Sequence, residues 1–153
     1  MLARDWFEDI RWQVLRVARA SAEIDAMRLK MGAHGQKYEA MSHGSNGDMA
    51  DAIVVLVQAE TELELAKVKL VGELERATEV LYGRSGRGGL AKARCSADAD
   101  CIMGYYLLGY TWKQVAEELV MPDSRDGAQW CKRRAYRALA ALDACDLRIL
   151  ADS

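Results

Sequence analysis

A cluster of long polar and basic side chains lies between residues 125 and 137, and helical spacing separates it from an apolar stripe. The apolar residues recur every three or four positions, as one buried helix face requires: Ala128, Cys131, Ala135, Ala138, Leu139 and Leu142. The polar residues fall outside this stripe or on its flanks: Arg125, Asp126, Gln129, Trp130, Lys132, Arg133, Arg134 and Arg137. Such a helix can pack on its own domain while presenting hydrogen-bonding groups to a groove of DNA.

The types of these residues indicate two kinds of contact with DNA. Arg can pair with guanine, Gln with adenine, and a carboxylate can accept from cytosine. We therefore expect four side chains near the start of the helix to reach base edges: Arg125, Asp126, Gln129 and Arg133. Those further along the helix are better placed to hold phosphates: Lys132, Arg134 and Arg137. Trp130 could stack on a sugar or a thymine methyl, but we expect it to turn back and cover the packing between helices.

A shorter helix is predicted directly before this one. Thr111 is its expected N-cap, and Gln114 three residues later completes a capping-box pattern. Its apolar stripe is Val115, Ala116 and Leu119. The chain's single proline, Pro122, closes it, and Ser124 can cap the basic helix. Lys113 and Gln114 could contact the DNA backbone, and Trp112 is expected in the core. A short helix, a tight turn and a longer helix match the helix-turn-helix pattern.

Residues 83–108 are expected to support and connect this pair. GRSGRGG, residues 83–89, must end any preceding helix because glycine has poor helix propensity. Four basic residues and no acidic one lie between Arg84 and Arg94, so we predict a flexible positive linker over 83–94 that is either a DNA arm or a solubilising hinge. Ser96 or Asp98 can then cap a support helix that ends at Gly109. Its inward residues are predicted to be Cys101, Ile102, Tyr105 and Leu108.

Two long helices are predicted in the N-terminal half. Residues 4–31 have a heptad-like seam with polar residues at two of its positions, Ser21 and Arg28. Residues 32–47 contain four glycines and predict a loop. Asp48 is the expected N-cap of a helix reaching Tyr82, about 50 Å long. Because such a helix cannot bury its apolar stripe alone, we expect it to pack against the first helix as an antiparallel hairpin, against a second copy of the chain, or both. Glu60 is expected either on the solvated face or on the seam, where it would set the register of the helix pair.

Composition favours an all-α fold. One proline and one phenylalanine stand in a chain of 153 residues that is 51% hydrophobic and 29% charged. No apolar run is long enough to cross a bilayer and the acidic start MLARDWFEDI lacks the order of a signal peptide, so we expect a cytoplasmic protein.

Metal sites, cofactors and catalysis are not expected. The four cysteines form no CxxC pair and are expected to be free thiols. His34 and His43 fall in the glycine-rich connection, and we expect no metal and no cofactor. The chain has neither a phosphate-loop motif nor a Ser/His/Asp arrangement, so we do not expect an enzyme.

The charge distribution divides the chain in the same way. Residues 1–82 carry 10 basic and 14 acidic side chains, whereas residues 83–142 carry 10 and 6. This predicts an oligomerisation or partner-binding hairpin over 1–82, the linker over 83–94, and a DNA-binding domain over 95–153.

The stretch from Ser96 to Ala144 resembles the C-terminal module of phage and prophage transcriptional regulators of the ArpU and RinA type. That module in turn is similar to region four of bacterial sigma factors. The residues that carry the resemblance are YYLLGYTWKQVAEEL, Tyr105 to Leu119, and RAYRALAAL, Arg134 to Leu142. The resemblance places groove-facing residues at Arg125, Asp126, Gln129, Trp130 and Arg133. The interval from Thr111 to Ala128 is about two residues longer than the family's pattern. The assignment of Arg125 and Asp126 as groove-facing residues is the part of the resemblance that this difference affects most.

The resemblance implies a sequence-specific regulator that binds double-stranded DNA, near a promoter where RNA polymerase is a potential partner. We expect a homodimer, because two copies place two helices on half-sites and double the phosphate contacts. One alternative is a small-terminase-like DNA-packaging adaptor, for which a higher oligomer is expected. Another is a protein that contacts RNA polymerase or a sigma factor through its acidic helices without binding DNA.

Overall fold

The computed structural model describes residues 1–38, 46–120 and 126–145, and all regular secondary structure within them is helical. The all-α prediction is therefore confirmed. The elements in chain order are α1 (Ala3–Tyr38), α2 (Asn46–Tyr82), α3 (Gly89–Ala93), α4 (Ser96–Ile102), the π-helical turn η1 (Met103–Leu107), α5 (Trp112–Val115), the π-helical turn η2 (Ala116–Val120) and α6 (Gly127–Asp143). Among the described residues, no helix is both long enough and apolar enough to span a membrane.

The chain divides into two compact units, and the division cuts through both long helices. Unit 1 comprises Met1–Val14 and Leu70–Ser153, and unit 2 comprises Leu15–Lys69. The sequence predicted a boundary at residue 82 instead. The difference arises because the first residues of α1 and the last turns of α2 belong to the core of unit 1: Phe7, Ile10, Ala77 and Leu81 are all fully buried there.

The start of α1 is fastened to the C-terminal part of unit 1 by several polar and aromatic contacts. The Phe7 ring packs against Tyr106 with centroids 5.8 Å apart. The guanidinium of Arg11 donates to the carbonyl oxygens of Tyr105 and Tyr110 and lies 3.7 Å from the Tyr105 ring centroid. At the helix start, the Ala3 amide donates to Asp143 Oδ1 at 2.5 Å. The hydrogen bonds join residues 94 to 140 positions apart, which local sequence patterns do not reveal.

The glycine-rich segment after α2 is folded, where the sequence predicted a flexible linker. The Gly88 amide donates to the Tyr82 carbonyl at 2.7 Å, and α3 begins one residue later. Gly89 has φ +60°, and a Cβ there would lie 2.6 Å from the Val80 carbonyl oxygen. Glycine is required because the backbone turns back against the end of α2 in a conformation that other residues adopt at a cost. The segment therefore holds the start of α3 close to the end of α2.

The support helix forms as expected but with a different start and a shifted register. Its N-cap is Cys95, and neither Ser96 nor Asp98 has that role. Beyond Ile102 the chain continues as the π-helical turn η1, which adds a residue per turn and moves the buried face onward. Consequently Tyr106 is fully buried, whereas Leu108, predicted inward, is 48% exposed. Gly109 ends the element with φ +74°, as predicted.

The capping box at the start of α5 is confirmed. The Gln114 amide donates to Thr111 Oγ1 at 3.2 Å, and the Thr111 amide donates to Gln114 Oε1 at 2.9 Å. Val115 and Ala116 are buried as predicted, while Leu119 is 41% exposed. The predicted breaker and cap, Pro122 and Ser124, lie outside the described residues. The helix α6 starts after Asp126 and buries Cys131, Ala135, Ala138, Leu139 and Leu142.

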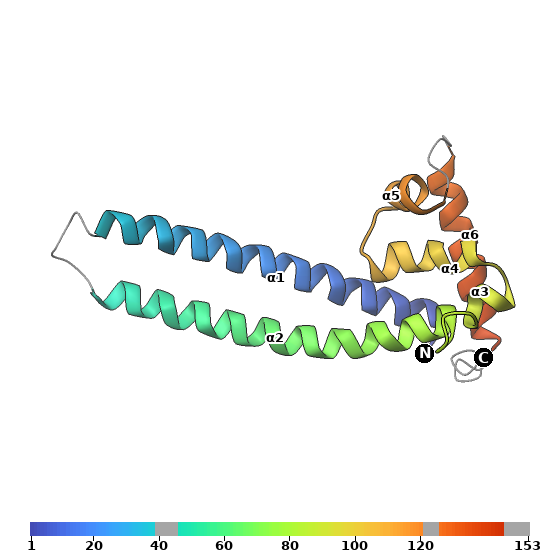
Figure 1. The fold of residues 1–153 in the computed structure, drawn as a ribbon, viewed down its shortest axis with the longest axis horizontal. Helices are drawn as coiled ribbons and strands as arrows, with labels where there is room; N and C mark the ends of the chain where they lie inside the picture. Colours follow the sequence, from blue (N-terminus) through green and yellow to red (C-terminus); the bar gives the residue numbers. More distant parts are fainter. Residues whose placement is uncertain (39–45, 121–125, 146–153) are drawn as a thin grey trace. The chain divides into compact units, whose positions relative to one another are not determined.

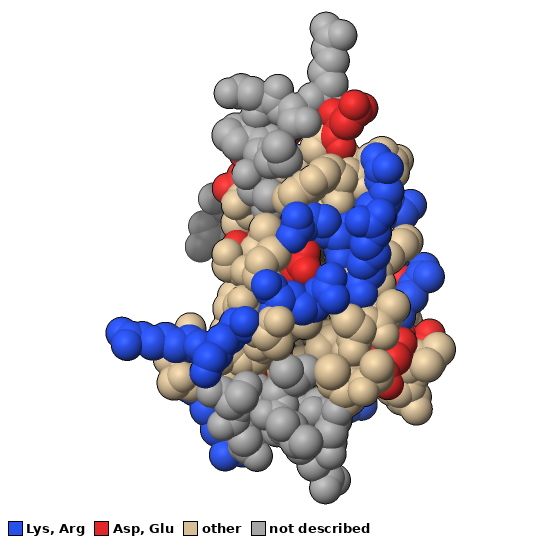
Figure 2. Space-filling view, turned by 90° about the vertical axis from the view of Figure 1, so that its right-hand side faces the viewer, with Lys and Arg blue, Asp and Glu red and all other residues tan. Residues whose placement is uncertain are grey.

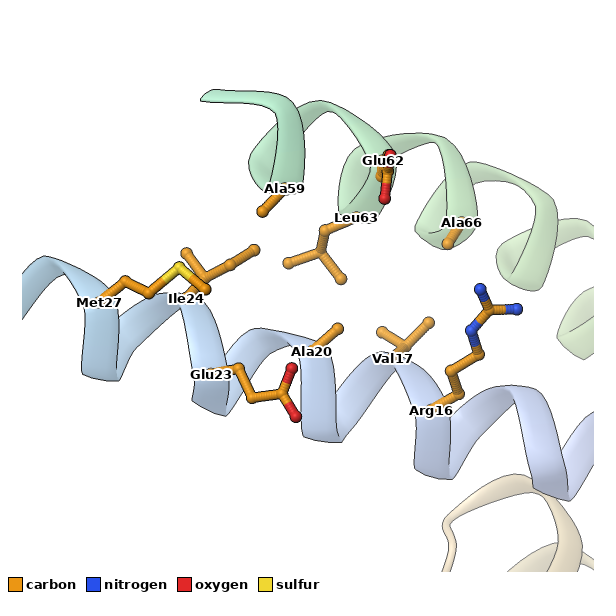
Figure 3. Close-up of a pocket in the computed structure, with 10 residues that line it drawn as sticks. All are labelled: Arg16, Val17, Ala20, Glu23, Ile24, Met27, Ala59, Glu62, Leu63 and Ala66. Carbon is orange, nitrogen blue, oxygen red and sulfur yellow. The ribbon is translucent and has the colours of Figure 1, made fainter. Parts of the chain in front are cut away.

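In unit 2, α1 and α2 run side by side in opposite directions (Figure 1). Val17 and Ile24 of α1 point toward α2, and Leu63 of α2 points toward α1 (Figure 3). Alanines on both helices help to line an open groove of about 170 Å³ beside them. Arg28, a polar position of the predicted seam, pairs with Glu60 at 2.5 Å. The ion pair explains why Arg28 and Glu60, which are both charged, can lie on the seam between the two helices. The helices are longer than predicted, since α1 reaches Tyr38 and α2 begins at Asn46.

Candidate nucleic-acid interface

The helix α6 separates a buried face from a polar face, as the sequence predicted. Its apolar side packs against α4 and α5 within unit 1. On the opposite side Gln129, Arg133 and Arg137 are exposed, and these three recur every four residues along one face. Arg133 Nε donates to the Gln129 carbonyl at 3.3 Å, which steadies the side chain along the helix. The guanidinium end of Arg133 is still presented on the exposed face.

Arg134 has an intramolecular role that the sequence did not predict. Its Nε donates to Asp98 Oδ1 at 2.7 Å, and its Nη2 donates to Cys95 Sγ at 2.7 Å. Its guanidinium carbon lies 4.6 Å from the centroid of the Trp130 ring, which is half-buried. The hydrogen bond to Asp98 raises the pKa of Arg134 above its ordinary value. Arg134 is thus held on α4, and its first role is to join α4 to α6.

Asp98 is the centre of this contact and also binds Arg94. The carboxylate is 4% exposed, and Arg94 Nε donates to its Oδ2 at 2.9 Å. Burial alone would raise the pKa of Asp98, but the hydrogen bonds from Arg94 and Arg134 outweigh it and hold the pKa below its usual value. Two guanidinium groups against one carboxylate leave a net positive charge on the surface. The ion pairs also bring the basic segment 83–94 beside α6.

The result is a basic surface formed by two segments that are separate in the sequence. Figure 2 shows Lys and Arg side chains gathered on one face, with a small acidic patch among them. The exposed basic residues contributed by segment 83–94 and α6 are Arg84, Arg87, Lys92, Arg94, Arg133 and Arg137. We call these six residues the basic surface. Arg94 and Asp98 were not predicted to pair; Arg94 follows α3 and Asp98 lies in α4, so their ion pair spans the turn between the two helices.

The remaining candidate residues have more local surroundings. Lys113 is exposed and pairs with Glu117 at 3.7 Å, and the Gln114 side chain is engaged in the capping box. Lys132 is half-buried with its Nζ 5.7 Å from the Tyr136 ring centroid. Asp126 is exposed at the N-cap of α6, and its side chain makes no capping hydrogen bond. Arg125 lies outside the described residues.

Aromatic packing behind the interface fixes the position of α5 relative to η1. The Trp112 ring stacks on Tyr105 with centroids 3.9 Å apart and an interplanar angle of 3°. Gly104 permits this approach, because a Cβ there would lie 2.9 Å from Val115 Cγ2. The basic helix therefore rests on a closely packed support.

The four cysteines lie in unit 1 as free thiols, and Cys145 is exposed. Cys101 and Cys131 are fully buried, and this burial raises the pKa of both thiols. Buried thiols with raised pKa values are poor nucleophiles and poor metal ligands. In the part of the chain that the structure describes, no group of three or more His, Cys, Asp or Glu residues could hold a metal ion.

Comparison with known proteins finds no matching family model, no matching curated protein and no matching solved structure.

Proposed function

We propose that this protein is a transcriptional regulator of the phage ArpU and RinA type that binds double-stranded DNA in a sequence-specific way. The observation that carries the proposal is the basic surface, in which the outer face of α6 adjoins segment 83–94 through the Arg94–Asp98–Arg134 contact. A strip of exposed arginines beside a polar helix face suits a phosphate backbone flanking a groove.

We further propose that α5, η2 and α6 form a helix-turn-helix and that α1 and α2 form a hairpin. The capping box at Thr111 and the buried Val115 and Ala116 support the first assignment, since they give a short helix packed against a longer one. The opposed course of α1 and α2 and the Arg28–Glu60 ion pair support the second. In this arrangement α6 enters the major groove.

The proposed roles follow from exposure along α6. Gln129 and Arg133, near its start, reach base edges, while Arg137 and the exposed basic residues of segment 83–94 hold phosphates. Asp126 is available to a base at the helix start. Arg134 positions the surface, because its guanidinium is bound to Asp98. We propose a homodimer, so that two copies of α6 contact two half-sites.

A DNA-binding titration tests this function. A duplex pool enriched from random sequence on the wild-type protein is titrated with wild type and with Arg133→Ala/Arg137→Ala by fluorescence anisotropy. We expect the double variant to bind about tenfold or more weakly, since each lost contact to a base or phosphate contributes about 1 kcal/mol or more.

The matched control is Arg19→Ala/Lys30→Ala, which removes the same charge from exposed positions of α1. It should bind as the wild type does. Equal losses in both double variants would indicate a nonspecific effect of net charge, and no binding by the wild type would refute the proposal.

A further inference from the structure

The outer side of α2 in unit 2 carries an apolar stripe that α1 does not cover. The stripe consists of Val54, Val57, Thr61, Leu65 and Val68, which share one helix face about opposite to the buried Leu63. Its four aliphatic side chains are between 54% and 73% exposed. Residues 52–59, AIVVLVQA, contain no charge, so Val54 and Val57 of the stripe lie in an uncharged stretch. A continuous exposed apolar stripe of this kind marks an interaction site.

Unit 2 also has too small a core to account for two long ordered helices. Of its described residues, only Ile24 and Leu63 are buried hydrophobic side chains. Two helices with so little buried apolar surface gain most of their stability from further packing. The stripe is the surface that can supply it.

The spacing of the stripe is symmetric about Thr61. Val57 and Leu65 lie four residues before and after it, and Val54 and Val68 lie seven residues before and after it. If a second α2 packs antiparallel on the first, with a two-fold axis at Thr61, Val54 lies opposite Val68 and Val57 opposite Leu65 in both directions. This is the self-complementary pattern of a two-fold interface between identical subunits.

The centre of the stripe can be buried without leaving a polar group unpaired. Thr61 Oγ1 donates to the Val57 carbonyl oxygen at 2.8 Å, within its own helix. Its methyl group is then the part available to the partner. A dry contact at the two-fold axis therefore costs no hydrogen bond.

Charge on the flank of the stripe fits the same arrangement. Asp51 and Lys69 are exposed and 18 residues apart, which is five helical turns, so they share one flank. In an antiparallel pair with a two-fold axis at Thr61, the same flank of both helices faces the same side of the pair. This arrangement therefore places Asp51 of one copy near Lys69 of the other. The two-fold axis generates this pair of opposite charges twice.

We infer that the outer stripe of α2 binds a second copy of this chain, as an antiparallel helix pair centred on Thr61. The inference deepens the proposed function, since it rests on the homodimer proposed there and names the dimer interface. It does not depend on DNA binding.

Disulfide trapping tests the geometry in the full-length chain. In a background with Cys145→Ser, which removes the exposed native thiol, Thr61→Cys should form a covalent dimer on mild oxidation. Val54→Cys alone should not, because two copies of residue 54 lie about 21 Å apart along an antiparallel pair, and a disulfide needs Cα atoms within about 7 Å. A mixture of Val54→Cys and Val68→Cys chains should give the mixed covalent dimer.

A substitution pair tests the interface without added thiols. Leu65→Glu places a charge on the stripe, and its matched control Leu29→Glu changes the same residue type on α1; the two leucines are 69% and 76% exposed. In analytical ultracentrifugation, Leu65→Glu should weaken self-association at least tenfold, while Leu29→Glu should match the wild type. Helix content by circular dichroism shows whether each variant is folded.

A monomeric wild type, or an oligomer that survives Leu65→Glu, would overturn the inference. Covalent dimers from Val54→Cys alone would overturn the antiparallel arrangement. DNA titration of the same variants distinguishes the two proposals. If the dimer depends on the stripe but the protein does not bind DNA, the regulator function is wrong and the interface stands. If the protein binds DNA but its dimer is unaffected by Leu65→Glu, only the interface is wrong.

Discussion

Asp98 is the residue on which the basic surface of unit 1 depends most. Its buried carboxylate binds Arg94 and Arg134 at 2.9 and 2.7 Å, and so joins segment 83–94 to α6. The sequence predicted Asp98 as a possible helix cap and Arg134 as a phosphate contact. The local sequence around each residue suggested those roles. The pairing between them was not predicted, because it spans 36 positions and depends on the packing of α4 against α6.

The substitution Asp98→Asn should reduce the free energy of unfolding by about 2 kcal/mol at pH 7, because it removes a carboxylate that satisfies two guanidinium groups. The control Glu117→Gln, which breaks an exposed single ion pair, should change it by about 0.5 kcal/mol or less. Urea unfolding of each variant gives these values.

The pH dependence of that difference has a defined sign. The folded-state pKa of Asp98 is lowered, so its stabilising contribution is fully present above the unfolded value of about 4 and is lost as pH falls through the folded value. The gap between wild type and Asp98→Asn should therefore be largest near neutral pH and shrink below about pH 4. A gap that widens on acidification would contradict this assignment.

Among the elements, local signals predicted two helix boundaries correctly but not the register of the buried face beyond Ile102. The capping box at Thr111 and the stop at Gly109 were predicted because each is encoded within a few residues. The π-helical turn η1 was not, because its extra residue is accommodated by contacts of Gly104 with distant side chains of α5 and η2. For the same reason the fully buried residue is Tyr106, whereas the sequence predicted Tyr105.

Two glycines of the segment after α2 offer a matched test of its folded conformation. Gly86 and Gly89 have φ values of +72° and +60°, but only a Cβ at Gly89 would meet backbone atoms, at 2.6 and 2.7 Å. Gly86→Ala should cost about 1 kcal/mol from the left-handed backbone alone, and Gly89→Ala at least twice as much. Thermal or urea unfolding would compare them, and equal costs would mean that α3 does not pack against α2 in this way.

At the scale of the whole molecule, the predicted division into an assembly half and a DNA-binding half needs a different boundary. The first turns of α1 and the last turns of α2 are part of unit 1, so Phe7 and Leu81 contribute to the same core as Leu139. Composition and charge could not locate this boundary, because both long helices continue through it. The proposed DNA-binding domain therefore includes residues 1–14, and a fragment starting at residue 83 should not fold as the full chain does.

The proposed binding of DNA phosphates by the basic surface is best tested by the salt dependence of the association constant. The logarithm of the association constant should fall linearly with the logarithm of salt concentration, with a slope of about −0.9 for each phosphate contact. We expect Arg133→Ala/Arg137→Ala to lower the magnitude of this slope by about one to two for each bound subunit. Arg19→Ala/Lys30→Ala should leave it unchanged. An identical slope for wild type and both double variants would mean that Arg133 and Arg137 do not contact DNA phosphates.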